Sequence, residues 1–199
     1  MTRPEFDWIY RPAPEEGALA RPLAPSKMEE DEPALFSPLG KKGANRYRRG
    51  LIIHKLLQFV PLAGDENKRE LMREFVAKNA AELPQFEQER ICEEVAELIE
   101  NPEFAPLFSP QSQAEVPIMG LADGKIISGQ VDRLVVMPSE VMVVDYKTNR
   151  PAASSLSEVP KAYISQLKAY KSLLSAVYQG KKISTFILWT DTANLMRVE

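Results

Sequence analysis

The sequence of 199 residues contains one cysteine, one histidine and no long hydrophobic run. With Cys92 as its only cysteine, the chain cannot form an internal disulfide bond or hold an iron–sulfur cluster on four cysteines of its own. It has no apolar stretch of about 18 residues and no signal-peptide pattern, so we expect a soluble, cytoplasmic protein without a membrane partner. A Gly-x-x-x-x-Gly-Lys-Ser/Thr motif is also absent, which excludes a nucleotide-hydrolysing loop of that type in this chain.

The net charge of −3 argues, on its own, against binding to nucleic acid. Its distribution is uneven, because residues 41–64 contain six basic residues and no acidic one, whereas residues 65–100 contain five basic and eleven acidic residues. The basic segment includes Lys41, Lys42, Arg46, Arg48 and Arg49, with Tyr47 among them. We expect these cations to contact a nucleic-acid backbone, and a solvated charged run is the alternative.

The distribution of proline divides the chain into two parts. Residues 1–43 include seven prolines and scattered acidic residues, a composition typical of an extended linker or arm. Residues 44–199 are enough for one domain with an ordinary hydrophobic core. A chain that opens with a linker is expected to be a piece of a longer protein.

Hydrophobic periodicity predicts an α/β fold for residues 44–199. A helical pattern begins at Ala44, with Tyr47, Leu51, His54, Leu56 and Leu57 near one stripe. The other expected helices are 66–80, 84–100, a short one at 103–108, and 160–178, and the expected strands are 113–119, 125–137, 140–147 and 183–190, with Asp123-Gly124 as a turn and a partial strand at the end. This order predicts a mixed sheet of about four or five strands, flanked by helix 160–178 and an N-terminal helical cap.

Two of these strands each contain an aspartate, and the second also carries a lysine. They read Gly129-Gln130-Val131-Asp132-Arg133-Leu134 and Val143-Val144-Asp145-Tyr146-Lys147-Thr148-Asn149. Alternate residues of a strand share a face, so Asp145 and Lys147 project together while Tyr146 faces away. A turn at residues 138–140 folds the strands side by side and brings Asp132 next to Asp145. Two carboxylates and an ammonium predict a hard-cation site suited to phosphodiester chemistry, and ordinary surface side chains are the alternative.

These residues resemble a known family. The ordered motifs are Arg48-Arg49-Gly50-x-x-x-His54, Asp132, Asp145-Tyr146-Lys147-Thr148 and Gln166-x-x-x-Tyr170, and they resemble the RecB-type nuclease domain of the PD-(D/E)XK superfamily. More narrowly, residues 48–58 and 144–150 resemble the C-terminal nuclease domain of AddA, the helicase–nuclease subunit of the bacterial AddAB complex. The resemblance extends from Arg48 to the end of the chain and implies a restriction-endonuclease-like core of order αβββαβ.

The resemblance also implies roles for individual residues. It makes His54, Asp132, Asp145 and the backbone carbonyl of Tyr146 ligands of Mg²⁺, with Mn²⁺ as a substitute. The position of Lys147 on the face of Asp145 favours a role in orienting the attacking water or stabilising the charge that builds on the phosphate. For His54, the only histidine, the pattern alone favours an ordinary core or surface residue.

Five further residues also receive assignments. The resemblance places an acid at Glu115, where it touches the metal through water or positions the histidine, and an exposed strand glutamate is equally compatible. Gln166 and Tyr170 share a helix face and are expected to contact DNA or orient catalytic groups, unless the helix is simply amphipathic. Asn149 and Arg150 follow the catalytic strand and are expected to reach DNA.

The resulting expectation is a metal-dependent DNA exonuclease domain that acts in double-strand-break repair and recombination. Its implied partners are single-stranded DNA, a helicase portion of the same polypeptide and an AddB-like subunit. One alternative is a non-catalytic DNA-binding or subunit-docking module that has the nuclease fold. Another is a nuclease of the same superfamily without a helicase.

Overall fold

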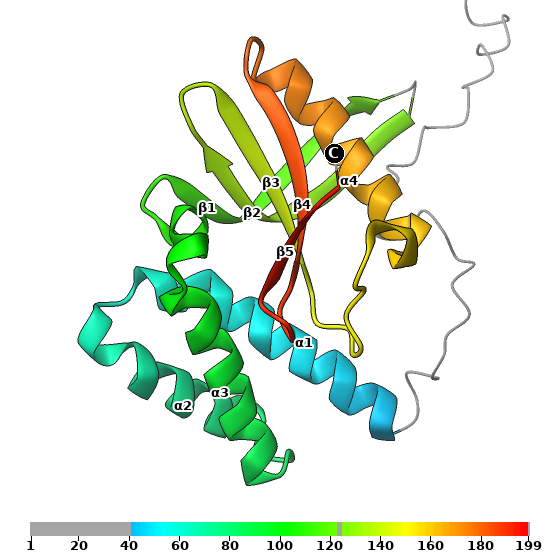
Figure 1. Ribbon diagram of the computed structural model, residues 1–199. Helices are drawn as coiled ribbons and strands as arrows, with labels where there is room; N and C mark the ends of the chain where they lie inside the picture. Colours follow the sequence, from blue (N-terminus) through cyan, green and yellow to red (C-terminus); the bar gives the residue numbers. More distant parts are fainter. Residues whose placement is uncertain (1–40, 123–124, 199) are drawn as a thin grey trace, which may run out of the picture.

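A five-stranded mixed sheet with helices on both faces forms the centre of the molecule (Figure 1). The structure is a computed structural model that describes residues 41–122 and 125–198, without the side chains of residues 41–44, 65, 122 and 125. The elements are α1 (Lys41–Phe59), η3 (Val60–Leu62), η4 (Asp65–Asn67), α2 (Lys68–Asn79), α3 (Gln85–Glu100), η5 (Pro102–Phe108), β1 (Ser112–Ala122), β2 (Lys125–Val136), β3 (Glu140–Lys147), η6 (Leu156–Glu158), α4 (Lys161–Val177), β4 (Lys182–Trp189) and β5 (Asn194–Arg197).

The strands follow the spatial order β1-β2-β3-β4-β5. β1, β2 and β3 form an antiparallel meander, β4 runs parallel to β3 after the crossover through α4, and β5 closes the far edge antiparallel to β4. The predicted α/β fold with the order αβββαβ is therefore confirmed. The predicted turn at Asp123-Gly124 lies outside the described residues, although Ala122 and Lys125 pair on either side of it.

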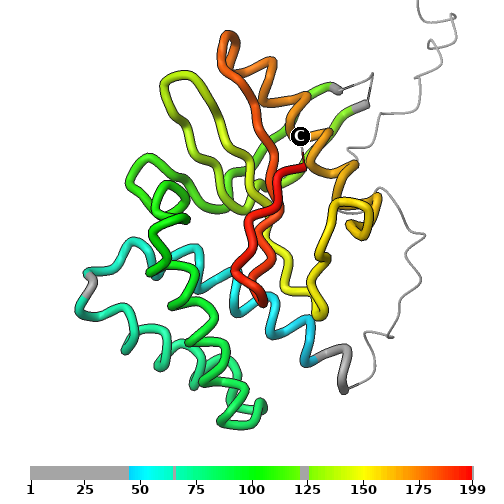
Figure 2. The backbone as a smooth tube through the Cα atoms, in the orientation of Figure 1, coloured from blue at the N-terminus to red at the C-terminus, as the bar shows by residue number. Residues whose placement is uncertain are grey.

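Two hydrophobic cores lie on opposite faces of the sheet. One joins α1, α2, α3 and η5 to the face that carries Val144 and Tyr146, and the other joins α4 to the face that carries Val143 and Ile187. The backbone trace shows the same division, with residues 45–64 and 66–108 gathered on one side of the sheet and α4 on the other (Figure 2). No helix among the described residues is long and apolar enough to cross a membrane.

The register of α1 differs from the predicted stripe. Its buried face consists of Ile52, Ile53, Leu56, Leu57 and the following Val60, each at most 4% exposed. Tyr47 and Leu51, which were expected on that stripe, are 70% and 48% exposed. The helix also begins at Lys41, three residues before the expected Ala44. The prediction was wrong at Tyr47 and Leu51 because several apolar residues of α1 compete for one packed face, and only tertiary packing selects among them.

A buried arginine on β2 fixes α1 against the sheet. Arg133 is 2% exposed, and its guanidinium donates hydrogen bonds to the carbonyl of Leu57 and, at 2.9 Å, to the hydroxyl of Tyr146. The guanidinium carbon also lies 5.3 Å from the centroid of the Phe108 ring. A buried charge needs such partners, and Leu57 is close to the negative end of the helix dipole. Arg133 thereby sets where the second half of α1 lies.

Candidate active site

The predicted aspartates lie where β2 and β3 separate. The β2–β3 ladder ends at the pair Arg133–Val144, while β3 continues to pair with β4 as far as Lys147. Asp132 is the first β2 residue beyond this ladder, and its Oδ2 accepts a 2.7 Å hydrogen bond from the backbone N–H of Tyr146. The Asp132 carboxylate thus accepts a hydrogen bond from the β3 backbone just past the last ladder pair. Asp132 therefore lies beside Asp145, as the sequence predicted.

Asp145 and Lys147 point to one face of β3, whereas Tyr146 is buried in the opposite core, as the strand pattern predicted. The ammonium of Lys147 lies 2.7 Å from Oδ2 of Asp145, whose residue is 4% exposed. Burial raises the pKa of Asp145, and the charge of Lys147 opposes this shift. For Lys147, burial would lower the pKa, but the adjacent carboxylate outweighs it and raises the pKa. The lysine therefore keeps its positive charge at neutral pH.

A helix residue and two strand residues form a possible cation site next to this ion pair. Ligand atoms of His54, Glu115 and Asp132 all lie within 4.8 Å of one another, and Nδ1 of His54 is 3.5 Å from Oδ1 of Asp132. Burial would lower the pKa of His54, but the contact with Asp132 raises it. Burial also raises the pKa of the Glu115 carboxyl, and the charge of Asp132 adds to that shift. Two carboxylates this close repel each other when both are charged, and a divalent cation between them would relieve that repulsion. Together with the imidazole they form a suitable set of ligands for a hard divalent cation.

The backbone at Glu115 is unusual for a glutamate. Its φ is +54°, in the left-handed region that residues other than glycine seldom adopt. The β1–β2 ladder pairs Ala114 with Arg133 and Val116 with Val131, and it passes over Glu115 and Asp132 between them. Strained backbone of this kind is found where the surrounding structure holds it for a function. Here it places Glu115 with His54 and Asp132, and a role of Glu115 toward a metal stays a prediction.

The Asp145 carboxylate is also held from α4. The side-chain amide of Gln166 donates to Oδ1 of Asp145 at 3.1 Å and contacts the hydroxyl of Tyr170 at 3.2 Å, and that hydroxyl donates to the carbonyl of Gln130 at 3.0 Å. Gly129 makes this approach possible, because a Cβ there would lie 2.7 Å from the Tyr170 hydroxyl oxygen. Gln166 and Tyr170 are thus buried against the site, as their shared helix face predicted.

The geometry agrees with a comparison of sequences. The chain matches the family model of the PD-(D/E)XK nuclease superfamily over residues 32–195, which is most of its length. It belongs to this superfamily. No curated protein matches the chain. Among solved structures it matches the crystal structure of SSO0001 with 16% identity and a TM-score of 0.34, over 78% of this chain and 77% of that chain, and so distant a likeness carries no argument about function.

In this PD-(D/E)XK domain, the predicted ligand set and the observed cluster overlap in part. His54 and Asp132 belong to both. Asp145 was predicted as a ligand, but in the structure its two carboxylate oxygens contact Lys147 and Gln166. Among the described residues, the third member of the cluster is Glu115. Ligation by Asp145 and by the Tyr146 carbonyl stays a prediction.

Several of the predicted DNA-binding cations belong to internal ion pairs. Arg49 of α1 pairs with Glu94 of α3, which also accepts from Arg150 at 3.0 Å, and Arg150 lies 2.5 Å from Asp191. Arg49 further donates to the carbonyl of Thr148 at 3.1 Å. Two carboxylates thus match the charges of Arg49 and Arg150, and the network ties α1 to the end of β3.

The remaining members of the predicted DNA-binding set have varied surroundings. Arg48 lies 2.6 Å from Glu82, and Arg46 donates to the carbonyl of Arg150 at 3.0 Å. The amide oxygen of Asn149 accepts from Tyr163 at 3.3 Å. The side chains of Lys41 and Lys42 lie outside the described residues. DNA contact by any of these groups stays a prediction.

Two residues near the site went unnoticed in the sequence. Tyr163 of α4 lies under Lys147, whose ammonium is 4.1 Å from the centroid of the ring. Its position one turn before Gln166 was the available signal, since residues three apart share a helix face. Glu94 had no such signal, because it is one of several glutamates in α3 and only folding brings Arg49 and Arg150 to it.

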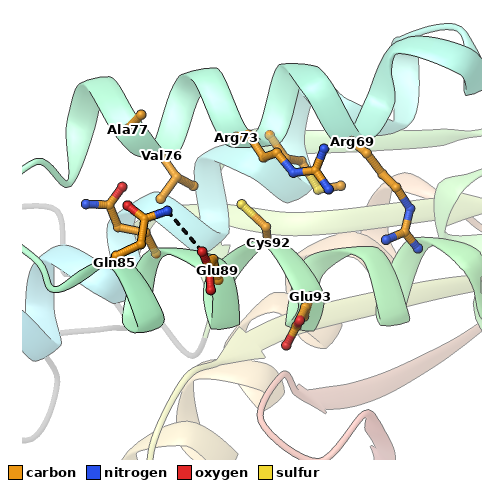
Figure 3. A pocket seen from close by; sticks show the side chains of 10 residues that line it. Arg69, Arg73, Val76, Ala77, Gln85, Glu89, Cys92 and Glu93 are labelled. Carbon is orange, nitrogen blue, oxygen red and sulfur yellow. Dashed lines mark hydrogen bonds between the residues drawn. The ribbon is translucent and has the colours of Figure 1, made fainter.

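A separate pocket of about 380 Å³ lies between α2 and α3 (Figure 3). Arg73, Glu89 and Cys92 line it, and none of the predicted site residues does. Burial raises the pKa of the Cys92 thiol. The lining shows that this pocket is a groove between two packed helices.

Proposed function

We propose that this chain hydrolyses phosphodiester bonds of single-stranded DNA with Mg²⁺, for which Mn²⁺ can substitute. Membership in the PD-(D/E)XK superfamily indicates nuclease chemistry, which uses a divalent metal. The observation that carries the proposal is the meeting of the cluster His54, Glu115 and Asp132 with the Lys147–Asp145 ion pair. This reaction needs carboxylates and an imidazole that can bind a cation, and it needs a positively charged group next to them.

Each group has a role that follows from its surroundings. A divalent ion bound at the cluster supplies a Lewis acid and a water of lowered pKa. Lys147 holds a positive charge where it can align the attacking water and stabilise the charge that builds on the phosphate. Asp145 directs that ammonium, and Gln166 and Tyr170 fix Asp145 in turn.

We extend the proposal to the biological setting that the motifs suggest. Residues 48–58 and 144–150 support an AddA-like exonuclease that belongs to a helicase–nuclease and acts in double-strand-break repair and recombination. In that setting, the helicase portion of the same polypeptide delivers a single strand, and an AddB-like subunit is the partner. Co-purification of the full-length protein with the subunit tests the AddB-like partner, and helicase motifs in the sequence that adjoins this chain test the helicase portion.

Cleavage and metal binding test the central proposal together. We expect the chain to cut an end-labelled single strand with Mg²⁺ or Mn²⁺, and Asp132→Ala to lose both cleavage and calorimetric Mn²⁺ binding. Glu74→Ala removes an exposed acid of α2 and serves as the control that keeps both. A wild-type chain that binds DNA and Mn²⁺ but does not cut would overturn the proposal in favour of a non-catalytic DNA-binding module.

A further inference from the structure

The first helix presents an exposed apolar stripe that leads to the candidate active site. Tyr47, Leu51 and His54 occupy helix positions i, i+4 and i+7, which lie on one face. Tyr47 is 70% exposed and Leu51 48%, whereas the packed face of α1 is formed by other residues. His54 ends this stripe inside the cation cluster. The packing of α1 therefore does not require Tyr47, and a ligand of the site has access to it.

A groove of about 570 Å³ runs beside this stripe between α1 and α2. Phe75 lines it together with Tyr47 and Leu51, and Lys55 lines it near the active site. Lys55 directly follows His54, the α1 member of the cluster, in the sequence. The groove thus carries a cation at the end where α1 reaches the cluster.

The charges of the groove favour an anionic ligand only modestly. Arg48 and Glu82 both line it, and they form an ion pair of 2.6 Å that cancels their charges. Lys55 donates a hydrogen bond to the amide oxygen of Gln58. Among the described residues that line the groove, it is the cation without an acidic partner in the lining. An apolar, aromatic surface with one cation suits the bases of a single strand better than a row of phosphates.

We propose that the stripe binds the bases of the substrate strand, with a base stacked on Tyr47, the strand following Leu51, and Lys55 next to a phosphate close to the cluster. This inference rests on the proposed function. Tyr47 and His54 are seven residues apart, or about 10.5 Å along the helix axis. At the roughly 3.4 Å spacing of stacked nucleotides, the base on Tyr47 is about three nucleotides from the bond to be cut.

Equilibrium binding of a labelled oligothymidylate tests the stacking contact, with Ca²⁺ in place of Mg²⁺ to prevent cleavage. We expect Tyr47→Ala to weaken binding about 5- to 150-fold, the range for loss of one stacked base, and Tyr47→Phe to bind like the wild type. Phe86→Ala is the matched control, because Phe86 is 58% exposed at the start of α3 and does not line the groove. Calorimetric Mn²⁺ binding should be the same for all four proteins.

A fluorescent base analogue then maps the contact. 2-Aminopurine at about the third nucleotide from the cut bond should be quenched by the wild type and not by Tyr47→Ala. If the wild type binds and cuts DNA while Tyr47→Ala binds DNA equally well, the inference is overturned. The exposed stripe would then be assigned to contact with a protein partner instead of DNA. If the wild type neither binds nor cuts single strands, the proposed function itself fails, and this inference fails with it.

Discussion

The ammonium of Lys147 lies against the face of the Tyr163 ring, 4.1 Å from its centroid. A contact of this type contributes about 0.5–1 kcal/mol at an exposed position and about 2 kcal/mol when it is desolvated. The Lys147 side chain is 16% exposed, which places it nearer the desolvated case. Tyr163 thus restrains the direction of the ammonium while Asp145 balances its charge.

Removing the ring should therefore slow cleavage without affecting metal binding. We expect Tyr163→Leu to lower the single-turnover rate about 2- to 30-fold, because the ammonium loses the surface that positions it. Tyr163→Phe keeps the ring and loses only the 3.3 Å hydrogen bond to Asn149, so its rate should stay close to that of the wild type. Equal losses in the two variants would assign the effect to the hydroxyl group.

Removing Lys147 should separate metal binding from catalysis. A protonated lysine is not a metal ligand, so Lys147→Ala should bind Mn²⁺ nearly as the wild type does and cut about 10²–10³-fold more slowly. The substitution also leaves Asp145 buried without its cation, which lowers the free energy of unfolding by up to about 3–5 kcal/mol. The rate is therefore measured where circular dichroism shows a folded chain. Cleavage near the wild-type rate would show that Lys147 has no part in the reaction.

The close approach of Tyr170 to β2 predicts the effect of a single methyl group. In Gly129→Ala the new Cβ would meet the Tyr170 hydroxyl at 2.7 Å, so the ring must move away from its bond with Gln130. We expect a loss of about 1–3 kcal/mol in the free energy of unfolding, together with slower cleavage as Gln166 loses its support. Gly64→Ala is the control, because nothing lies within 4 Å of its Cβ position. Equal urea midpoints for both variants would contradict this account.

The thiol of Cys92 should react slowly in the folded chain. Burial raises its pKa above the ordinary value of 9.0, with Arg73 opposing, so less of the nucleophilic thiolate is present at any given pH. Alkylation by iodoacetamide at pH 8 should be slower in buffer than in urea, and the rate should rise with pH until the raised pKa is passed. Mass spectrometry of the labelled chain measures both rates, and equal rates would show that the thiol is not protected.

The sequence predicted the strands and the side chains that share a strand face. β3 was expected at residues 140–147 and occupies Glu140–Lys147, and Asp145 and Lys147 project together as expected. These features follow from a period of two residues, which depends only on the local backbone. The placement of Asp132 beside them also followed, because one short turn joins β2 to β3.

Features that depend on distant partners were not predictable. The left-handed backbone of Glu115 has no local signal, since glutamate does not favour it, and the surrounding fold must impose it. The basic segment was visible as a run of charges, but the partners of Arg49 and Arg48 are Glu94 and Glu82, which only the packing of three helices brings near. Sequence patterns show which side chains are charged and leave open where each charge is balanced.

The cation cluster joins the helical layer to the strands of the sheet. His54 belongs to the helical layer, whereas Glu115 and Asp132 belong to the strands. An ion that binds only when these residues are together stabilises the folded chain by about 2.7 kcal/mol at 100 times its dissociation constant. Without the ion, we expect the layer of α1, α2 and α3 to open with a smaller free energy than the whole chain. We therefore expect occupancy of the site to increase the cooperativity with which the helical layer and the sheet unfold.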